Sequence, residues 1–192
     1  MQPKNLKTNF LGRNIIFYKE IDSTQSEIWR LVENKSIKYG TTVVADIQTN
    51  GKGTHGRIWH TDEPNNIAFS FFIQMDCNIK KLEGITTKIA QIILDIFKTK
   101  YGINLEIKEP NDIVYNNKKI GGILTETKLI SENVKYLVVG IGINTSKQEF
   151  SSDIKDIATS ISKEFGVNIE VEDFIAEFCN RFEKEIIKRR ES

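Results

Sequence analysis

The sequence predicts an α+β domain in which helices flank a β-sheet. Several segments are rich in β-branched and aromatic residues, as strands are, and longer segments repeat apolar residues at the spacing of one helix face. The 192 residues are enough for one sizeable core, and no repeat, low-complexity tract or linker divides them. We therefore expect a single domain over residues 1–192.

The composition and charge of the chain argue against several classes of function. The net charge of +1 argues against a general binder of nucleic acid or of membrane surfaces. Cys77 and Cys179 are far apart and in no metal-binding spacing, which favours reduced thiols in a cytoplasmic protein. The sequence has neither an apolar leader segment nor an apolar run that could span a bilayer. No third ligand lies near His55 and His60, so a structural zinc site is not expected.

The first predicted elements are a strand and a helix. Residues 14–19 read NIIFYK and predict the strand. The helix follows at once, with Asp22, Ser23 or Thr24 as its N-cap. Capping alone explains these residues, but a cap that faces a pocket would also offer two hydroxyl groups to a polar ligand.

A glycine-rich loop, residues 48–59, separates two predicted strands at 41–47 and 67–75. The loop reads QTNGKGTHGRIW and matches neither the Walker A spacing nor GxGxxG. Its open backbone can bring several N–H groups close to an anion while Lys52 and Arg57 add positive charge. A flexible basic surface loop is the alternative. The clustering of glycines, cations and a tryptophan favours a loop that binds a phosphate or an adenylate.

Three further helices are predicted after residue 80. Apolar residues in 82–101 predict an amphipathic helix that covers one sheet face. A short helix is expected over residues 154–165, and a longer one from residue 172 onward. The basic residues 188–190 suit the negative C-terminal end of the last helix, so we interpret them as a solvated helix end.

Glycines recur on two of the remaining predicted strands, which are residues 105–108, 113–115, 120–124 and 134–144. Gly121 and Gly122 lie in one strand, and Gly140 and Gly142 lie in another. Glycine inside a strand marks a β-bulge or a close approach of backbone or ligand. Because the glycines recur in pairs, we favour a flat slot that accepts something thin over two β-bulges.

Four short sequence motifs, taken together, are similar to those of one known family. They are DST at 22–24, GKGTHGRIW at 51–59, KEPND with KIGGIL at 108–112 and 119–124, and GIGIN at 140–144. In this order the chain resembles the catalytic domain of biotin–protein ligases, from about Ile15 to the final helix. The resemblance implies a mixed β-sheet flanked by helices, akin to class II aminoacyl-tRNA synthetases and lipoate ligases. It also implies ATP-dependent conversion of biotin to biotinyl-5′-AMP, followed by transfer to a lysine of a biotin carboxyl carrier protein.

The resemblance implies roles for the motif residues. Biotin would be bound by Ser23, Thr24, Gln25, Gln48, Gly51, Lys52, Gly53, Thr54, Lys119, Gly122, Leu124, Gly140 and Gly142. ATP would be bound by Lys52, Thr54, Arg57, Trp59, Lys108, Asn111 and Asn144. The catalytic residues would be Lys108, Lys119 and Arg57, and Asp112 would hold Mg²⁺.

The residue types agree with that chemistry. Adenylation presses a carboxylate and a phosphate together, and two lysines can neutralise such a pair of anions. Hydroxyl and amide groups at the closed end of an apolar slot suit a neutral ureido ring. The nucleophile comes from the substrate in both steps, so no Ser–His–Asp or Cys–His arrangement is needed.

The chain departs from the family pattern at two motifs. Lys52, Thr54 and His55 stand where the common form of the loop has arginines. The arginine replaced by Thr54 is thought to retain the reactive adenylate, so the intermediate would leak unless another cation such as Lys52 substitutes. Glu109 replaces the usual tryptophan, and one explanation is that it points away from the site, as alternate strand residues do.

Partners and alternatives follow from the resemblance. No helix-turn-helix precedes the catalytic motifs and no small β-barrel is expected after them, so binding to operator DNA is not predicted. A homodimer through an exposed sheet edge is expected by analogy. Two alternatives stay open, namely a lipoate or octanoate ligase or transferase of the same fold, and a non-catalytic module that binds biotin or a nucleotide.

Overall fold

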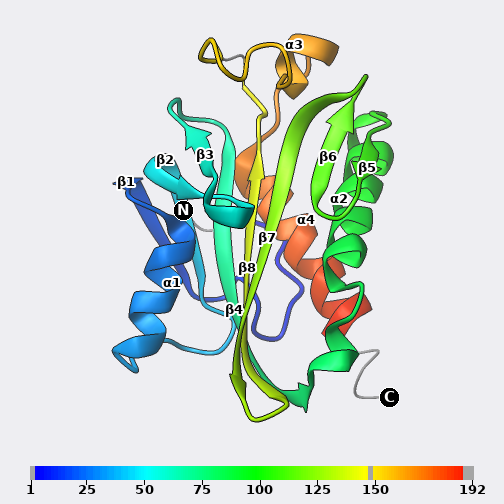
Figure 1. Ribbon diagram of the computed structural model, residues 1–192. Helices are drawn as coiled ribbons and strands as arrows, with labels where there is room; N and C mark the ends of the chain where they lie inside the picture. Colours follow the sequence, from blue (N-terminus) through cyan, green and yellow to red (C-terminus); the bar gives the residue numbers. More distant parts are fainter. Residues whose placement is uncertain (1–2, 147–148, 188–192) are drawn as a thin grey trace.

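The computed structural model describes residues 3–146 and 149–187 (Figure 1). Its strands are β1 Ile15–Ile21, β2 Thr42–Lys52, β3 Ile58–Thr61, β4 Ile67–Asn78, β5 Glu106–Lys108, β6 Asp112–Tyr115, β7 Lys118–Ile130 and β8 Asn133–Ile143. They form one sheet in the order β1-β2-β4-β8-β7-β6-β5, and β3 pairs with β2. β1 runs parallel to β2, whereas the other pairs are antiparallel. The sheet is therefore mixed, which confirms the predicted fold class.

Helices lie on both faces of the sheet. The α-helices are α1 Thr24–Glu33, α2 Ile85–Tyr101, α3 Ile161–Phe165 and α4 Val171–Phe182, and shorter turns are η1 Thr54–Gly56, η2 Ile79–Leu82 and η3 Glu183–Ile187. Figure 1 shows α1 on one side of the sheet and α4 passing behind β7 and β8. None of the helices in the described ranges is both long and apolar enough to cross a membrane.

The alternation of side chains along β8 separates a packed face from a functional face. Ile141 of β8 and Phe71 of β4 belong to the large core beneath α2 and α4. Val138 points the other way and packs in a smaller cluster under α1. Gly140 and Gly142 share the face of Val138, because successive strand residues point to opposite sides. The sheet thus leaves an open strip beside the N-terminus of α1.

The strand register tests whether the glycines of β7 and β8 mark β-bulges or a close approach of other groups. Pairing between β7 and β8 is continuous from Gly121–Ile143 to Lys128–Tyr136, and the irregularity lies beyond Lys128. The β-bulge alternative is therefore wrong for Gly140 and Gly142, whose pairing with β4 is regular as well, and a close approach of other groups is the remaining explanation. In β7, by contrast, the pairing with β6 shifts its register between Gly121 and Lys119.

The predicted helix over residues 154–165 is wrong in its first half, because α3 begins only at Ile161. The preceding residues pair with β7 instead. Lys119 N–H donates to the Ile157 carbonyl at 2.7 Å, and Thr159 N–H donates to the Lys119 carbonyl at 2.9 Å. The residues just before this pairing form isolated turns, in which the Ile157 and Ala158 N–H groups donate to the Ile154 carbonyl at 3.0 and 2.9 Å. These turns do not continue into α3, because the bonds to Lys119 separate them from it.

A buried carboxylate fastens the N-terminal segment to the end of the chain. The backbone N–H groups of Asn9, Phe10 and Leu11 donate to Glu183 at 2.6, 3.2 and 3.1 Å. Glu183 is 2% exposed, so these three donors supply the hydrogen bonds that a buried carboxylate needs. The predicted basic helix end at residues 188–190 lies outside the described residues.

Candidate active site

A narrow slot opens on the functional face, where α1, the end of β2, β7 and β8 meet. It is lined by Ser23, Thr24, Gln25, Gln48, Lys52, Gly53, Thr54, Trp59, Ser70, Asn111, Lys119, Gly122, Ile123, Leu124, Gly140, Ile141 and Gly142. The structure therefore brings together the residues predicted to bind biotin, with the exception of Gly51. Gly51 lies behind the lining, where an added Cβ would contact the Trp59 backbone and Gln48 Nε2.

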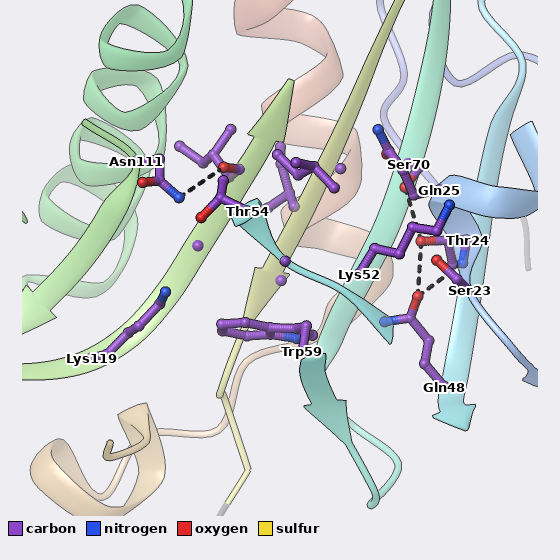
Figure 2. Close-up of a pocket in the computed structure, with 17 residues that line it drawn as sticks. Ser23, Thr24, Gln25, Gln48, Lys52, Thr54, Trp59, Ser70, Asn111 and Lys119 are labelled. Carbon is purple, nitrogen blue, oxygen red and sulfur yellow. Dashed lines mark hydrogen bonds between the residues drawn. The ribbon is translucent and has the colours of Figure 1, made fainter. Parts of the chain in front are cut away.

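One wall of the slot is a buried hydrogen-bond chain (Figure 2). Gln48 Oε1 accepts from the Thr24 backbone N–H at 2.8 Å and from Thr24 Oγ1 at 3.1 Å. Because the Thr24 hydroxyl donates to Gln48, Ser70 Oγ is the donor in its 2.9 Å bond to Thr24 Oγ1. Gln48 Nε2 donates one hydrogen to Thr61 Oγ1 at 3.2 Å and keeps a second N–H. Neutral donors and acceptors thus occupy fixed positions.

The N-cap of α1 also faces the slot. Ser23 is the cap residue, and its hydroxyl oxygen accepts from Ser26 N–H at a long 3.4 Å. Ser23 is 1% exposed and lines the slot. Ser23 therefore both caps α1 and lines the slot, which is the combination that the sequence left open.

Side chains, not bulges, account for two of the glycines. A Cβ on Gly142 would overlap the indole of Trp59, and a Cβ on Gly140 would lie 2.7 Å from Gln25 Oε1. A Cβ on Gly122 would touch the same indole and the Lys119 side chain at 3.4 Å. A thin group does lie over Gly122 and Gly142, and in this structure it is the indole of Trp59. The open volume left in the slot is about 40 Å³.

The glycine-rich loop closes one end of the slot. Gly53 N–H donates to the Arg57 carbonyl at 2.8 Å, and Arg57 N–H donates to the Thr54 carbonyl at 3.2 Å. The Arg57 guanidinium also donates to Thr54 Oγ1 at 2.8 Å. His55 and Gly56 have φ of 56° and 74°, so the loop turns through the left-handed region. Thr54, which replaces a family arginine, thus holds the neighbouring arginine.

A second pocket of about 350 Å³ adjoins the slot. Both share Gly53, Thr54, Trp59 and Lys119 as lining residues. Of the residues predicted to bind ATP, this pocket is lined by Thr54, Arg57, Trp59, Lys108 and Asn144, whereas Lys52 and Asn111 line the slot. Apolar residues complete its wall, namely Ile58, Val114, Phe150, Ile154, Ile157 and Ala158. Its volume is within the range of small-molecule sites.

Positive charge gathers at the boundary of the two pockets. Lys119 Nζ lies 2.6 Å from Asp112 Oδ1 and 5.6 Å from the centre of the Trp59 ring. Lys108 stands opposite Asp112 in the β5–β6 ladder. Asp112 is the one carboxylate among the described residues that line either pocket, against the cations Lys52, Arg57, Lys108 and Lys119. The boundary is therefore suited to anions.

The two predicted nucleotide-binding asparagines also have backbone partners. Asn111 Nδ2 donates to the Ile123 carbonyl at 3.2 Å, and Asn144 Nδ2 donates to the Thr159 carbonyl at 3.1 Å. These bonds fix β6 against β7 and the 158–160 segment against β8. Each amide keeps its oxygen for a ligand.

Glu109 lines neither pocket, as expected, but strand alternation is not the reason, because Glu109 lies in the turn between β5 and β6. Its carboxylate accepts from Thr87 Oγ1 of α2 at 3.2 Å. The residue therefore fastens the β5–β6 turn to α2. Ser70, which the sequence reasoning missed, is signalled by its place as a polar residue inside the apolar run IAFSFFI.

A resident metal centre is not indicated by the side chains. Within residues 3–146 and 149–187, no group of three His, Cys, Asp or Glu residues is arranged to hold a metal ion. Cys77 and Cys179 are free thiols, and Cys179 is buried. Burial raises the pKa of the Cys179 thiol, which keeps it protonated and unreactive.

Comparison with known proteins gives one consistent family. Residues 17–144 match the model of the biotin/lipoate A/B protein ligase family. The chain is 38% identical over 181 residues to the bifunctional ligase/repressor BirA of Bacillus spizizenii, and the match covers 93% of this chain and 55% of that protein. It thus spans about half the length of this curated relative.

Solved structures of biotin protein ligases are similar to the chain as well. A biotin protein ligase R40G mutant from Aquifex aeolicus in complex with biotin has a TM-score of 0.74 and 30% identity, covering 94% of this chain and 72% of that one. The Aquifex aeolicus ligase in complex with biotin and ATP has a TM-score of 0.68 and 32% identity, covering 92% and 75%.

Proposed function

Because the chain belongs to the biotin/lipoate A/B protein ligase family, we propose that it activates biotin with ATP and transfers the biotinyl group to a lysine of a biotin carboxyl carrier protein. Relatives named as biotin protein ligases, and neighbours solved with biotin and with ATP, support this proposal. The acceptor, a cytoplasmic location and a homodimer belong to the proposal as well.

The adjoining pockets are the observation that carries the proposal. The slot offers neutral hydrogen-bonding groups for a ureido ring, and the second pocket offers cations for phosphates. Lys119 belongs to both, so a carboxylate at the end of a slot ligand and a phosphate in the second pocket would meet beside it. Adenylation requires this meeting of two anions.

The proposed chemistry has two steps. In the first, a biotin carboxylate oxygen bonds to the α-phosphorus of ATP and the bond to pyrophosphate breaks. Lys108, Lys119 and Arg57 would reduce the repulsion between the two anions, and Lys119 would exchange its contact with Asp112 for them. In the second, the amine of the acceptor lysine attacks the acyl carbon and AMP leaves. The chain supplies charge and position, and no nucleophile.

Mg²⁺ fits this site as a companion of ATP. Asp112 is a suitable oxygen ligand, and one or two carboxylates together with phosphate oxygens form the usual magnesium environment. When bound, the ion would neutralise phosphate charge. Lys108, Lys119 and Arg57 would still neutralise negative charge at the α-phosphate.

The alternatives are less well supported. A lipoate or octanoate enzyme is not favoured, since the named relatives are biotin ligases and the slot carries an amide and hydroxyl set suited to a ureido ring. A non-catalytic binding module would not need Lys108, Lys119 and Arg57 around the second pocket.

Calorimetric titration with biotin, followed by ATP and Mg²⁺ with detection of pyrophosphate, tests the proposal. We expect biotin binding and pyrophosphate release from the wild type. Lys108→Ala should abolish pyrophosphate release and retain biotin binding, because Lys108 lines the second pocket and not the slot. Normal turnover by this variant would remove the role of Lys108, and binding without release by the wild type would favour the non-catalytic module.

A further inference from the structure

A carboxylate outside the slot lining controls a side chain inside it. Gln25 lies in the first turn of α1 and is 2% exposed. Its Nε2 donates to Glu126 Oε2 of β7 at 2.9 Å. Trp29, one helical turn later, donates its indole N–H to the same oxygen at 2.6 Å. Glu126 therefore links α1 to the strand that forms the opposite side of the slot.

The other end of the same amide faces the slot without a partner. Gln25 Oε1 is buried and accepts no hydrogen bond from any described residue. It lies over β8, since a Cβ on Gly140 would approach it to 2.7 Å. Gly140 and Gln25 both line the slot. A buried acceptor left unpaired is unfavourable, and a donor from a ligand would satisfy it.

The chemistry of Glu126 fixes which end of the amide faces inward. A carboxylate only accepts hydrogen bonds, so the end of Gln25 that contacts Glu126 must be its NH₂ group. The carbonyl oxygen is then turned toward Gly140 and away from Glu126. If Glu126 were apolar, either orientation of the amide would be open and the slot would lose a defined acceptor.

We propose that Glu126 is a positioning residue that holds the Gln25 carbonyl oxygen ready to accept a ring N–H of the ligand. This inference rests on the proposed function, because a ureido ring carries two N–H donors. Gln25 thereby selects for a ring that can donate, whereas Thr24, Gln48 and Ser70 form the separate hydrogen-bond chain of the slot.

Two substitutions of Glu126 form a matched pair. Glu126→Met has a similar length and no acceptor, so the Gln25 amide is released, and the Kd for biotin should rise roughly tenfold. Glu126→Gln keeps one oxygen that can accept from both donors, so its Kd should stay within about threefold of the wild type. Calorimetry measures Kd. Steady-state kinetics should show the KM for biotin rising, with kcat and the KM for ATP unchanged.

A double-mutant cycle separates positioning from packing. Gln25→Met should itself raise the Kd for biotin roughly tenfold, and Glu126→Met should add nothing further in that background. Trp29→Phe removes the other donor to Glu126 and leaves the Gln25 contact, so it should bind biotin like the wild type. If Glu126→Met does not fold, Gln25→Met still tests the acceptor.

The outcomes are distinct. Full biotin affinity in Gln25→Met, additive losses in the cycle, or an equal rise in the KM for ATP would overturn the positioning role. In each of those cases a wild type that binds biotin and releases pyrophosphate leaves the proposed function standing. A wild type that binds no biotin would overturn both.

Discussion

Substitution of Gly142 tests whether Trp59 is the reason for a glycine near the end of β8. In Gly142→Ala the new Cβ would lie less than 3.0 Å from three atoms of the indole, Cε2, Nε1 and Cζ2. Real Cβ atoms essentially never show such a distance, so the ring must move. Gly122 is the cross-strand partner of Gly142 and faces the same ring. Its added Cβ would make ordinary contact at 3.4 Å, which makes Gly122→Ala the matched control.

The expected loss of stability in Gly142→Ala depends on how far the Trp59 indole can move. Overpacking costs about 1–3 kcal/mol when neighbours are held in place. Trp59 is half-buried and can yield in part, so we expect about 1–2 kcal/mol for Gly142→Ala. For a chain of this size that lowers the melting temperature by about 2–8 °C. Gly122→Ala should cost less than about 0.5 kcal/mol.

Thermal unfolding and tryptophan emission measure the two effects. In a Trp29→Phe background Trp59 is the remaining tryptophan of two, and its emission should shift to longer wavelength in Gly142→Ala as the ring leaves the strand. In a Trp59→Ala background the penalty for Gly142→Ala should vanish. Equal melting temperatures for the two glycine variants, or a penalty that persists without Trp59, would refute the reasoning.

Two further predictions concern residues beside the site. Glu109→Ala should leave pyrophosphate release unchanged and lower the melting temperature by under about 4 °C, because Glu109 contacts Thr87 and lines neither pocket; a tenfold loss of kcat would contradict this. The Arg30 guanidinium holds the pKa of Asp22 at about 2, below its usual 3.8, so Arg30→Met should raise that pKa toward 3.8 in an NMR titration. The stabilisation is present above pH 3.8 and is lost as pH falls through 2; it amounts to about 0.5–1 kcal/mol, since the two side chains are 44% and 43% exposed. An unchanged pKa would contradict the prediction.

Much of the site could be predicted from the sequence because its residues lie in short motifs. Ser23, Thr54 and Lys119 reach one slot from three separate motifs, and the order of those motifs along the chain was enough to group them. The flat shape of the slot also followed, since glycines on one face of adjacent strands leave space above them.

The rest depends on contacts between distant residues, which local patterns do not encode. The sequence shows that Gly142 makes room for something thin, but not that the indole of Trp59 takes that room. In the same way, apolar spacing favoured one helix over residues 154–165, whereas the bonds of Ile157 and Thr159 to Lys119 interrupt it before Ile161. Glu126 had no local signal either, because its two partners lie about a hundred residues earlier.

The buried contact of Glu183 has a consequence for how the chain acquires its fold. Its three amide partners are 172 to 174 residues away, so this contact closes a loop that contains most of the described residues. During synthesis from the N-terminus, the amides of residues 9–11 would stay bonded to water until Glu183 had emerged. Contacts of such separation are slow to form because loop closure precedes the gain in enthalpy. We therefore expect the N-terminal segment to be among the last parts of the molecule to become protected from hydrogen exchange during refolding.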